Sequence, residues 1–371
     1  MVRLTEDYPK PEELKSISVQ YRGKKRLVTC YCGQTVASSI VPHLKKKHPQ
    51  KWNEWVDVFI NLRGKGYTLK RIMKLFGTAD GRLLFSWTVI ERAIRAKVEA
   101  GKVDYRPPPK REIKYLGPPT FCAETTTLWD FPSRGDWAVH TGDYRGNWPP
   151  QIPRNLIEKF TQKGDTVLDV FAGGGTTLIE AWLLDRRSVG IDISNVAIQT
   201  TNAKIAELLD YTKRTPTEKL DLDIIPIVIQ GNSIKLTRLL DKNEINKDRI
   251  KLICVHPPYL SSLKYTLDGD GDLSLISDPV VFCRLLSRIA VQVYKVLHCD
   301  GTCAVLIGDT RKNGKLCPLG FKVLNTFLKR KFRLENIIIK TQNKDRSSEF
   351  YLKDNSLDIL LAHEYLFILK K

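Results

Sequence analysis

The sequence predicts an α/β protein: a doubly wound, mostly parallel sheet with a C-terminal antiparallel hairpin, preceded by a small, mainly helical basic module. Three observations favour this fold. Short apolar runs alternate with stretches of helical length from about residue 160 onward, as in a parallel sheet covered by helices. A glycine-rich turn joins a buried strand to a helix in VLDVFAGGGTT, residues 167–177. The net charge of +19 is concentrated in the first third of the chain.

The basic charge is unevenly distributed. Residues 1–117 contain 25 Lys and Arg against 11 Asp and Glu, whereas residues 118–371 contain 35 against 30. An excess of cationic side chains suits a polyanion, because each neutralised phosphate releases counterions. We therefore expect a nucleic acid as partner. A basic surface that contacts only water is the alternative.

The cysteines and the N-terminus indicate an intracellular protein. Of the 8 cysteines, only Cys30 and Cys32 cluster, so no disulfide framework is expected. The opening MVRLTEDYPK lacks the apolar stretch of a signal peptide, and no apolar run reaches the length of a membrane span. These features predict a cytoplasmic, nucleoid-associated protein with reduced thiols.

A candidate zinc site lies in LVTCYCGQTVASSIVPHLKKKH, residues 27–48. Cys30 and Cys32 are followed, after ten residues, by His43 and His48. Two thiolates and two imidazoles suit tetrahedral zinc, and the second half is typical of a zinc-finger helix. The one-residue gap between the cysteines is shorter than usual. The alternative is a buried cysteine pair with two surface histidines on a lysine-rich helix.

The rest of the first module is expected to be helical. Residues 52–76 have apolar side chains at helical spacing on both sides of a Gly-Lys-Gly break, and 82–100 form a longer amphipathic helix. The two short helices fit a helix-turn-helix or an ordinary helical hairpin. Proline-rich segments in 101–120 predict a linker. We therefore divide the chain into 1–118, a nucleic-acid-binding module with its linker, and 119–371.

The second domain is organised around the glycine turn. Asp169 is the one charge in a buried strand, and the three glycines after it allow positive φ and the close approach of a ligand. Thr176 is expected to cap the following helix. Asp192 ends the next strand, 23 residues after Asp169, close to the offset at which nucleotide-binding folds place a carboxylate on a ribose. The turn lacks a pyrophosphate-binding pattern and suits an adenosyl ligand.

Two motifs resemble those of a known family. VLDVFAGGGTTLIEA resembles the cofactor motif of the class I methyltransferases that act on exocyclic amino groups of DNA bases, and VHPPYL at 255–260 resembles their (D/N/S/T)-P-P-Y tetrapeptide. The resemblance covers roughly residues 120–371. It implies S-adenosylmethionine as cofactor and a flipped base of duplex DNA as substrate. The cofactor-binding residues that it implies are Asp169, Phe171, Ala172, Gly173, Gly175, Thr176, Asp192, Ile193 and Asn232.

The tetrapeptide explains how a poor nucleophile could react. The lone pair of an exocyclic amine is delocalised into the ring, so a catalyst must accept its N–H hydrogen bonds and aim it. In the family, the residue before the prolines and the first proline carbonyl do this; here they are His256 and Pro257. The two prolines, Pro257 and Pro258, fix φ twice, and Tyr259 offers a face for base stacking.

His256 departs from the usual pattern. Asp at this position is common in N6-adenine enzymes, and Ser or Thr in N4-cytosine enzymes. A neutral histidine has one acceptor nitrogen, and we favour N4 of cytosine because the residue is uncharged. If so, activity should fall as pH drops through the His256 pKa, which we expect between pH 8 and 5.5.

Other readings remain. An RNA base or a protein amide could be the methyl acceptor, since the same tetrapeptide serves such targets, or the chain could bind nucleic acid without turnover. A cognate restriction endonuclease could accompany the enzyme. Sequence recognition, if present, is expected in the N-terminal module.

Overall fold

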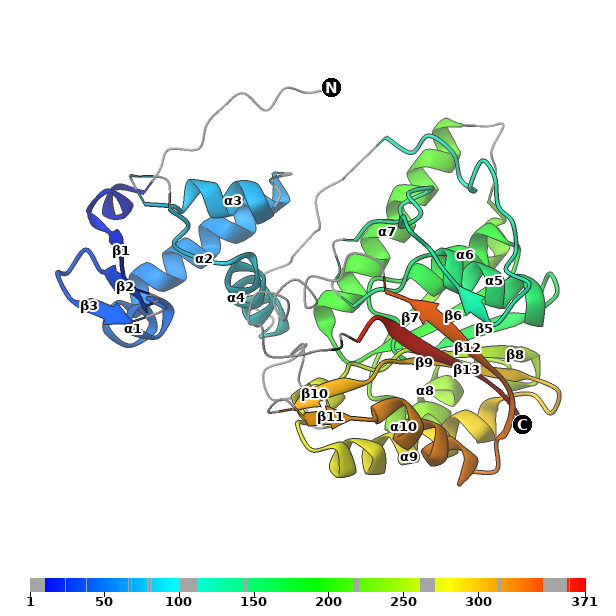
Figure 1. Cartoon of the computed structure of the whole chain (residues 1–371). Coiled ribbons are helices and arrows are strands. Elements are labelled where there is room, and N and C mark those ends of the chain that lie inside the picture. The colour runs from blue at the N-terminus through cyan, green and yellow to red at the C-terminus, as the bar shows by residue number, and fades with distance from the viewer. Residues whose placement is uncertain are drawn as a thin grey trace. The chain divides into compact units, whose positions relative to one another are not determined.

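The computed structural model describes residues 11–371 with gaps. It omits 24, 38, 66, 68, 79, 81, 101–111, 143, 145, 216–219, 261–270, 313–314, 343–358 and 360. The chain divides into two compact units, Met1–Lys110 and Arg111–Lys371 (Figure 1). This division falls inside the expected linker, slightly before residue 118. The proline triplet at 107–109, most of the loop after HPPY and the charged segment 344–358 lie outside the described residues.

In its described part, the first unit combines a small sheet with four α-helices. Its antiparallel sheet has the order β1-β2-β3 and follows a short 3₁₀ helix. The expected module was mainly helical, and its sheet was not anticipated. The sheet strands are β1 (Ser18–Arg22), β2 (Lys25–Thr29) and β3 (Thr35–Ala37). The helices are α1 (Val41–Lys47), α2 (Pro49–Gly64), α3 (Leu69–Leu75) and α4 (Trp87–Glu99).

Aromatic side chains form the core of this unit. Phe59 and Phe76 meet edge to face with ring centroids 4.6 Å apart, and Phe85 lies 5.9 Å from both Phe59 and Trp55. Buried aromatic rings remove large apolar areas from water and favour such tilted contacts. The helical spacing seen in residues 52–76 therefore reflects a packed core. Whether α2 and α3 act as a helix-turn-helix stays a prediction.

The second unit is built on an eight-stranded sheet of order β4-β12-β13-β9-β8-β5-β6-β7 (Figure 1). Neighbours from β9 to β7 are parallel, and β13 runs antiparallel to both of its neighbours. The predicted doubly wound, mostly parallel sheet is confirmed. Its strands are β4 (Leu128–Trp129), β5 (Thr166–Asp169), β6 (Arg187–Asp192), β7 (Ile227–Gln230), β8 (Ile250–Val255), β9 (Thr302–Ile307), β12 (Arg333–Thr341) and β13 (His363–Lys370).

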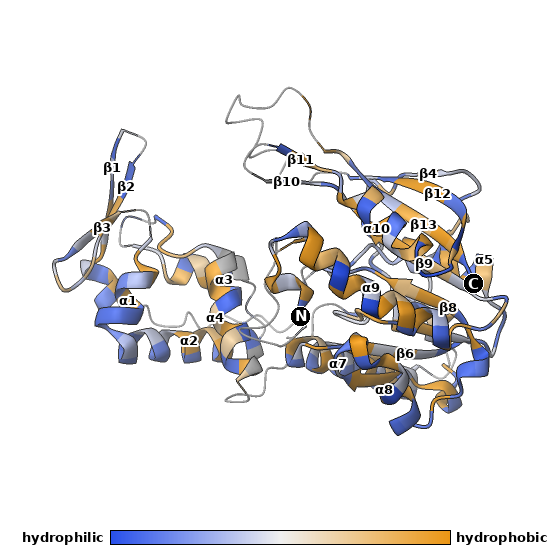
Figure 2. Cartoon of the chain, turned by 90° about the horizontal axis from the view of Figure 1, so that it is seen from below, coloured by the Kyte–Doolittle hydropathy of each residue, from blue (hydrophilic) through white to orange (hydrophobic). Residues whose placement is uncertain are grey.

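Helices cover both faces of this sheet. Leu252 and Cys254 of β8 pack with α5 and α6, whereas Ile253 and Val255 pack with α8, α9 and α10. A central strand is thus apolar on both faces, which is why its sequence is a continuous apolar run; Figure 2 shows this hydropathy along the strands. The helices are α5 (Gln151–Phe160), α6 (Thr176–Leu183), α7 (Asn195–Arg214), α8 (Leu236–Lys242), α9 (Pro279–Val296) and α10 (Leu319–Leu328).

The predicted C-terminal antiparallel hairpin is present, but it does not form the edge of the sheet. β13 lies between β12 and β9, and the two-residue β4 forms the edge beyond β12. A further hairpin, β10 (Thr310–Lys312) with β11 (Lys315–Cys317), forms a separate two-stranded sheet that the sequence did not suggest. Asp309 accepts a hydrogen bond from Gly320 N at 2.9 Å and so holds the start of α10.

Among the described residues, no helix combines the length and the apolar composition needed to cross a bilayer.

The packing of β6 against α6 yields a first prediction. A Cβ on Gly190 would lie 2.6 Å from Leu178 Cδ2 and 2.9 Å from Ala172 Cβ. We expect Gly190→Ala to destabilise the second unit by about 1–3 kcal/mol through overpacking. Urea unfolding of the full chain, followed by circular dichroism, measures the shift.

Gly117→Ala is the matched control, because a Cβ there meets nothing within 4 Å. It should change stability by less than about 0.5 kcal/mol. Identical unfolding curves for the two variants would contradict the overpacking.

Candidate active site

A cavity of about 460 Å³ lies at the carboxyl ends of β5, β6, β7 and β8. From β5 the chain proceeds outward through β6 and β7, then returns to place β8 on the other side of β5. Ligands of open α/β sheets bind where the strand order reverses in this way. The volume is that of a small-molecule site.

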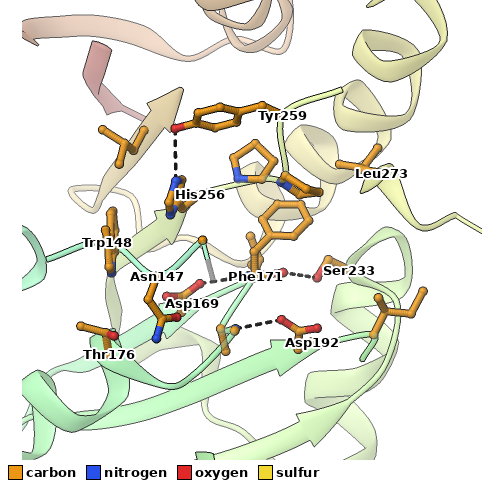
Figure 3. A pocket seen from close by; sticks show the side chains of 18 of the residues that line it. Asn147, Trp148, Asp169, Phe171, Thr176, Asp192, Ser233, His256, Tyr259 and Leu273 are labelled. Atoms are coloured by element: carbon orange, nitrogen blue, oxygen red, sulfur yellow. Dashed lines mark hydrogen bonds between the residues drawn. The ribbon is translucent and has the colours of Figure 1, made fainter. Parts of the chain in front are cut away.

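The cavity brings together the residues of both sequence motifs (Figure 3). Of the predicted cofactor-binding and catalytic residues, Gly175 alone is absent from its lining. Its φ is +75°, and an added Cβ would lie 2.5 Å from Thr201 Cγ2, which explains why this residue is glycine. The predicted residues that line the cavity are Asp169, Phe171, Ala172, Gly173, Thr176, Asp192, Ile193, Asn232, His256, Pro257, Pro258 and Tyr259.

Asp169 fixes the start of the glycine turn. Its carboxylate accepts hydrogen bonds from Phe171 N at 2.9 Å and from Thr177 Oγ1. Burial raises the pKa of Asp169 to about 6, although both of these hydrogen bonds oppose the shift. The carboxyl group is therefore ionised at neutral pH and titrates only slightly below it.

Asp192 and α7 hold the rest of the turn. Asp192 Oδ2 accepts from Gly173 N at 2.8 Å, and Oδ1 accepts from Ser194 N at 2.9 Å. Lys204, buried in α7, donates to Gly174 O at 2.8 Å, and burial lowers its pKa to about 7. The turn is thus preorganised by side chains on both of its sides.

Two buried polar atoms in the cavity wall have no hydrogen-bond partner within the described protein: Thr176 Oγ1 and Asn147 Nδ2. The prediction that Thr176 caps α6 is wrong, because Gly175 is the N-cap and no side chain caps the helix. Buried polar groups are normally paired, so an unpaired donor and hydroxyl facing a cavity indicate a polar ligand. The cavity therefore fits a group with an apolar body and several polar atoms.

The segment before α5 is fastened to α6 by a buried carboxylate. Glu180 accepts from Trp137 Nε1 at 2.6 Å and Arg154 Nη1 at 3.1 Å, and contacts His140 Nε2 at 2.5 Å. Arg134 Nη1 donates to Asn147 O at 3.0 Å. Because α6 begins at the glycine turn, these bonds fix the loop that brings Asn147 and Trp148 to the cavity.

His256 is held between aromatic rings. Trp148 stacks on it with centroids 5.5 Å apart and planes at 18°, and Tyr259 Oη lies 3.2 Å from His256 Nε2 (Figure 3). Burial lowers the pKa of His256 to about 4. The imidazole is therefore neutral well below pH 5.5. Our expectation that His256 titrates between pH 8 and 5.5 is too high. The sequence does not reveal how far this ring is desolvated.

Two further cavity residues escaped the sequence analysis. Glu364 of β13 accepts from Tyr259 Oη at 2.7 Å and from Lys340 Nζ at 2.8 Å. Burial alone would raise the pKa of Glu364, but the charge of Lys340 and these hydrogen bonds outweigh it and lower the pKa. A charged residue at the start of the apolar strand 363–370 is the one signal that could have indicated it.

Asn232 is engaged by the backbone. Its Oδ1 accepts from Ile234 N at 2.9 Å and so caps a 3₁₀ helix. The family position implied a contact of this oxygen with an adenine amino group. An amide oxygen has two lone pairs, so this bond by itself does not conflict with the implied role.

The predicted zinc ligands of the first unit lie together. One ligand atom each of Cys30, Cys32, His43 and His48 falls within 4.8 Å of all the others. Cys32 Sγ lies 3.3 Å from His43 Nε2, and His48 Nε2 is buried with no described partner. The cysteines lie in the β2–β3 turn, and the histidines belong to α1 and its C-cap. The arrangement is that of four ligands around a common point.

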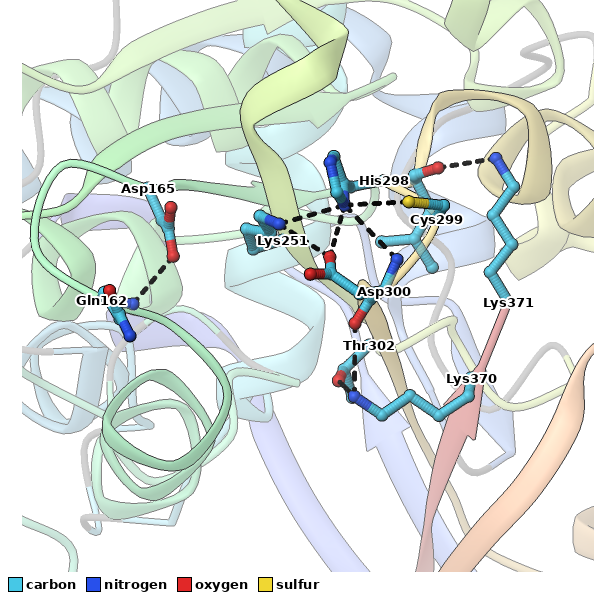
Figure 4. Close-up of polar contacts among 10 residues, drawn as sticks. Gln162, Asp165, Lys251, His298, Cys299, Asp300, Thr302, Lys370 and Lys371 are labelled. Atoms are coloured by element: carbon cyan, nitrogen blue, oxygen red, sulfur yellow. Dashed lines mark hydrogen bonds and ion pairs between the residues drawn. The ribbon is translucent and has the colours of Figure 1, made fainter.

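A second cluster, His298, Cys299 and Asp300, lies at the amino-terminal ends of β8 and β9 (Figure 4). Lys251 Nζ lies 2.7 Å from Asp300 Oδ1 and 3.0 Å from His298 Nδ1. An ammonium group already neutralises this carboxylate, so the cluster forms an ion-pair network. It lies at the amino-terminal ends of the strands, whereas the cavity lies at their carboxyl ends.

Comparison with known proteins finds similarity to DNA methylases over part of the chain. A family model described as DNA methylase, of the N6 and N4 type, matches residues 45–203. The match begins within the first unit, although the resemblance in the sequence seemed to start near residue 120, and it ends before the HPPY tetrapeptide.

The individual relatives that match are type II methyltransferases. A 77-residue segment is 39% identical to the type II methyltransferase M.BglI of Bacillus subtilis, covering 20% of this chain and 22% of that protein. A 68-residue segment is 51% identical to the type II methyltransferase M.MjaI of Methanocaldococcus jannaschii, covering 18% and 22%. The matched segments thus span about a fifth of these relatives.

Among solved structures, an rRNA methylase from Streptococcus thermophilus superposes with a TM-score of 0.34 and 11% identity, over 61% of this chain and 97% of that one. The family model over residues 45–203 and the curated relatives support the resemblance to the N4/N6 DNA amino-methyltransferases, and the two motifs that carry this resemblance meet in one cavity.

Proposed function

We propose that the chain transfers a methyl group from S-adenosylmethionine to the exocyclic amino group of a flipped DNA base, with N4 of cytosine favoured over N6 of adenine. The observation that carries this proposal is that one cavity contains both the glycine turn and the HPPY tetrapeptide. The type II methyltransferase relatives support DNA as the substrate.

The glycine-turn end of the cavity would hold the cofactor. Asp192 would accept from the ribose hydroxyls, and Asp169 would lie near the cationic methionine end. The unpaired Thr176 Oγ1 and Asn147 Nδ2 offer hydrogen bonds to the polar atoms of the ligand. When bound, S-adenosylmethionine supplies an electrophilic methyl group on a sulfonium, so no metal is required for the transfer.

The HPPY end of the cavity would orient the amine. A neutral His256 accepts one N–H bond and the Pro257 carbonyl accepts the other, which localises the nitrogen lone pair toward the methyl group. Tyr259 would contact the extruded base. The low pKa of His256 keeps an uncharged acceptor there. This supports N4 of cytosine, because the N6-adenine enzymes commonly use a carboxylate at this position.

The basic first unit would bind the DNA backbone, and a structural zinc ion in the Cys30–His48 cluster would stabilise it. Two thiols and two imidazoles match the ligand preference of zinc. The unpartnered, buried His48 Nε2 supports a ligand that completes the cluster. A cognate endonuclease remains a proposal that the type II relatives suggest.

Methyl transfer tests the function directly. The full chain is incubated with tritiated S-adenosylmethionine and either duplex DNA or structured RNA, and digested products are identified by mass spectrometry. We expect N4-methylcytosine from DNA. His256→Ala should lower kcat by about 10²-fold or more, as the loss of a preorganised hydrogen-bonding group does elsewhere.

His298→Ala is the matched control, because His298 lies at the amino-terminal ends of the strands, away from the cavity. It should leave the rate unchanged. Label in RNA alone would overturn the DNA assignment, and N6-methyladenine would overturn the choice of base. Full activity of His256→Ala would remove its role as acceptor.

The two perturbed pKa values predict separable pH effects. Asp169 becomes protonated as pH falls below about 6, so its attraction for a cationic ligand is lost there. We expect the Kd for S-adenosylmethionine to rise toward tenfold per pH unit below about 6. Turnover at saturating cofactor should stay level until His256 is protonated, near pH 4. Isothermal titration calorimetry and initial rates separate these effects.

Asp169→Asn should bind the cofactor weakly with no pH dependence in this range. Asp165→Asn, at the amino end of the same strand, should behave like the wild type. A Kd that does not change between pH 7 and 5 would contradict the role of Asp169.

The zinc proposal is tested by elemental analysis. We expect about one zinc ion per chain, lost in Cys32→Ser, with an earlier thermal transition because metal binding and folding of such a site are coupled. Cys122→Ser, an exposed cysteine of the second unit, should keep its zinc. Well-folded wild-type protein without metal would remove the proposed site.

A further inference from the structure

Four side chains form a hydrogen-bonded series along one wall of the cavity. His256 Nε2 lies 3.2 Å from Tyr259 Oη, Tyr259 Oη donates to Glu364 at 2.7 Å, and Lys340 Nζ donates to Glu364 at 2.8 Å. All four residues line the cavity. The series connects the HPPY tetrapeptide to the reversed strand β13 and its neighbour β12.

The far end of this series is a buried ion pair. Lys340 and Glu364 face each other across the antiparallel β12–β13 pair, and their side chains are only 12% and 10% exposed. The ammonium group of Lys340 keeps Glu364 ionised, and an ionised carboxylate accepts hydrogen bonds and donates none. The hydrogen between Tyr259 and Glu364 therefore belongs to the tyrosine.

This assignment fixes the next hydrogen. A phenol carries one hydrogen, and Tyr259 has given it to Glu364, so its oxygen can only accept from His256. The bond between the two side chains then needs a hydrogen on His256 Nε2. A neutral imidazole has one N–H, which leaves Nδ1 with the lone pair. The stacked ring of Trp148 holds the imidazole plane in place.

We propose that Glu364, acting through Tyr259, is a positioning residue that holds His256 as the Nε2–H tautomer and so makes Nδ1 the acceptor for the amino group of the substrate. This inference rests on the proposed function. With the opposite tautomer, an N–H would occupy the position of the acceptor, and the substrate amine would lose the hydrogen bond that orients it.

The tautomer is measured without substrate or cofactor. Long-range ¹H–¹⁵N correlation spectra of the full chain, labelled at histidine, distinguish a protonated from an unprotonated ring nitrogen. The His256 signals are assigned by their absence in His256→Asn. We expect a protonated Nε2 and an unprotonated Nδ1. In Glu364→Gln the amide can donate to Tyr259. The tyrosine hydrogen can then point to His256 Nε2, so a substantial fraction of His256 should convert to the Nδ1–H form.

Tyr259→Phe provides a second variant that leaves the Lys340–Glu364 pair intact, in case Glu364→Gln does not fold. It should give a mixture of both tautomers. Glu335→Gln, an exposed glutamate on β12, is the matched control and should keep the wild-type spectrum. In the methylation assay, Glu364→Gln should lower kcat by about 10- to 100-fold with little change in the Kd for the cofactor.

The two proposals can fail separately. A protonated Nδ1 in the wild type, or unchanged spectra in both Glu364→Gln and Tyr259→Phe, would overturn the positioning role even if the chain methylates DNA. The expected spectra together with no methyl transfer would leave the tautomer assignment standing and refute the function.

Discussion

The buried carboxylate of Asp169 is the interaction on which the geometry of the site depends. It ends the central strand β5 and bonds both to the backbone after the strand and to the helix that follows. Strand, turn and helix are thereby fixed to one another within a few residues. Asp192, at the end of the neighbouring strand β6, accepts from Gly173 N in the same turn. The two carboxylates therefore hold the glycine turn from both strands. A carboxylate without these bonds would not remain ionised inside an apolar sheet.

The second half of the site depends on the sheet order. Because β8 lies on the opposite side of β5 from β6, the HPPY segment emerges beside the glycine turn although about 80 residues separate the two motifs. Local sequence sets each motif, and topology brings them into one cavity. The proposed division of labour, with the cofactor at one end and the base at the other, follows from this arrangement.

Much of this was readable from the sequence. The apolar runs predicted the buried strands, and the resemblance of the two motifs to those of one methyltransferase family implied that they serve one site. Glu364 and Lys340 could not be predicted, because their importance comes from cross-strand register in a hairpin that inserts into the sheet and does not lie at its edge. The pKa of His256 was misplaced for a related reason: desolvation by Trp148 and its surroundings is a property of packing. The small sheet of the first unit was missed because its strands are short and bury few side chains.

The position of β13 has a consequence for biosynthesis. Strand pairing can insert β13 between β9 and β12 only after the ribosome has delivered residues 363–370, more than a hundred residues after the tetrapeptide. Until then His256 and Tyr259 have no Glu364, and β9 presents an open edge that could pair with other chains. A nascent chain carrying both motifs would therefore be aggregation-prone and incompletely assembled. Insertion of this one strand would cover the edge of β9 and complete the site in the same step.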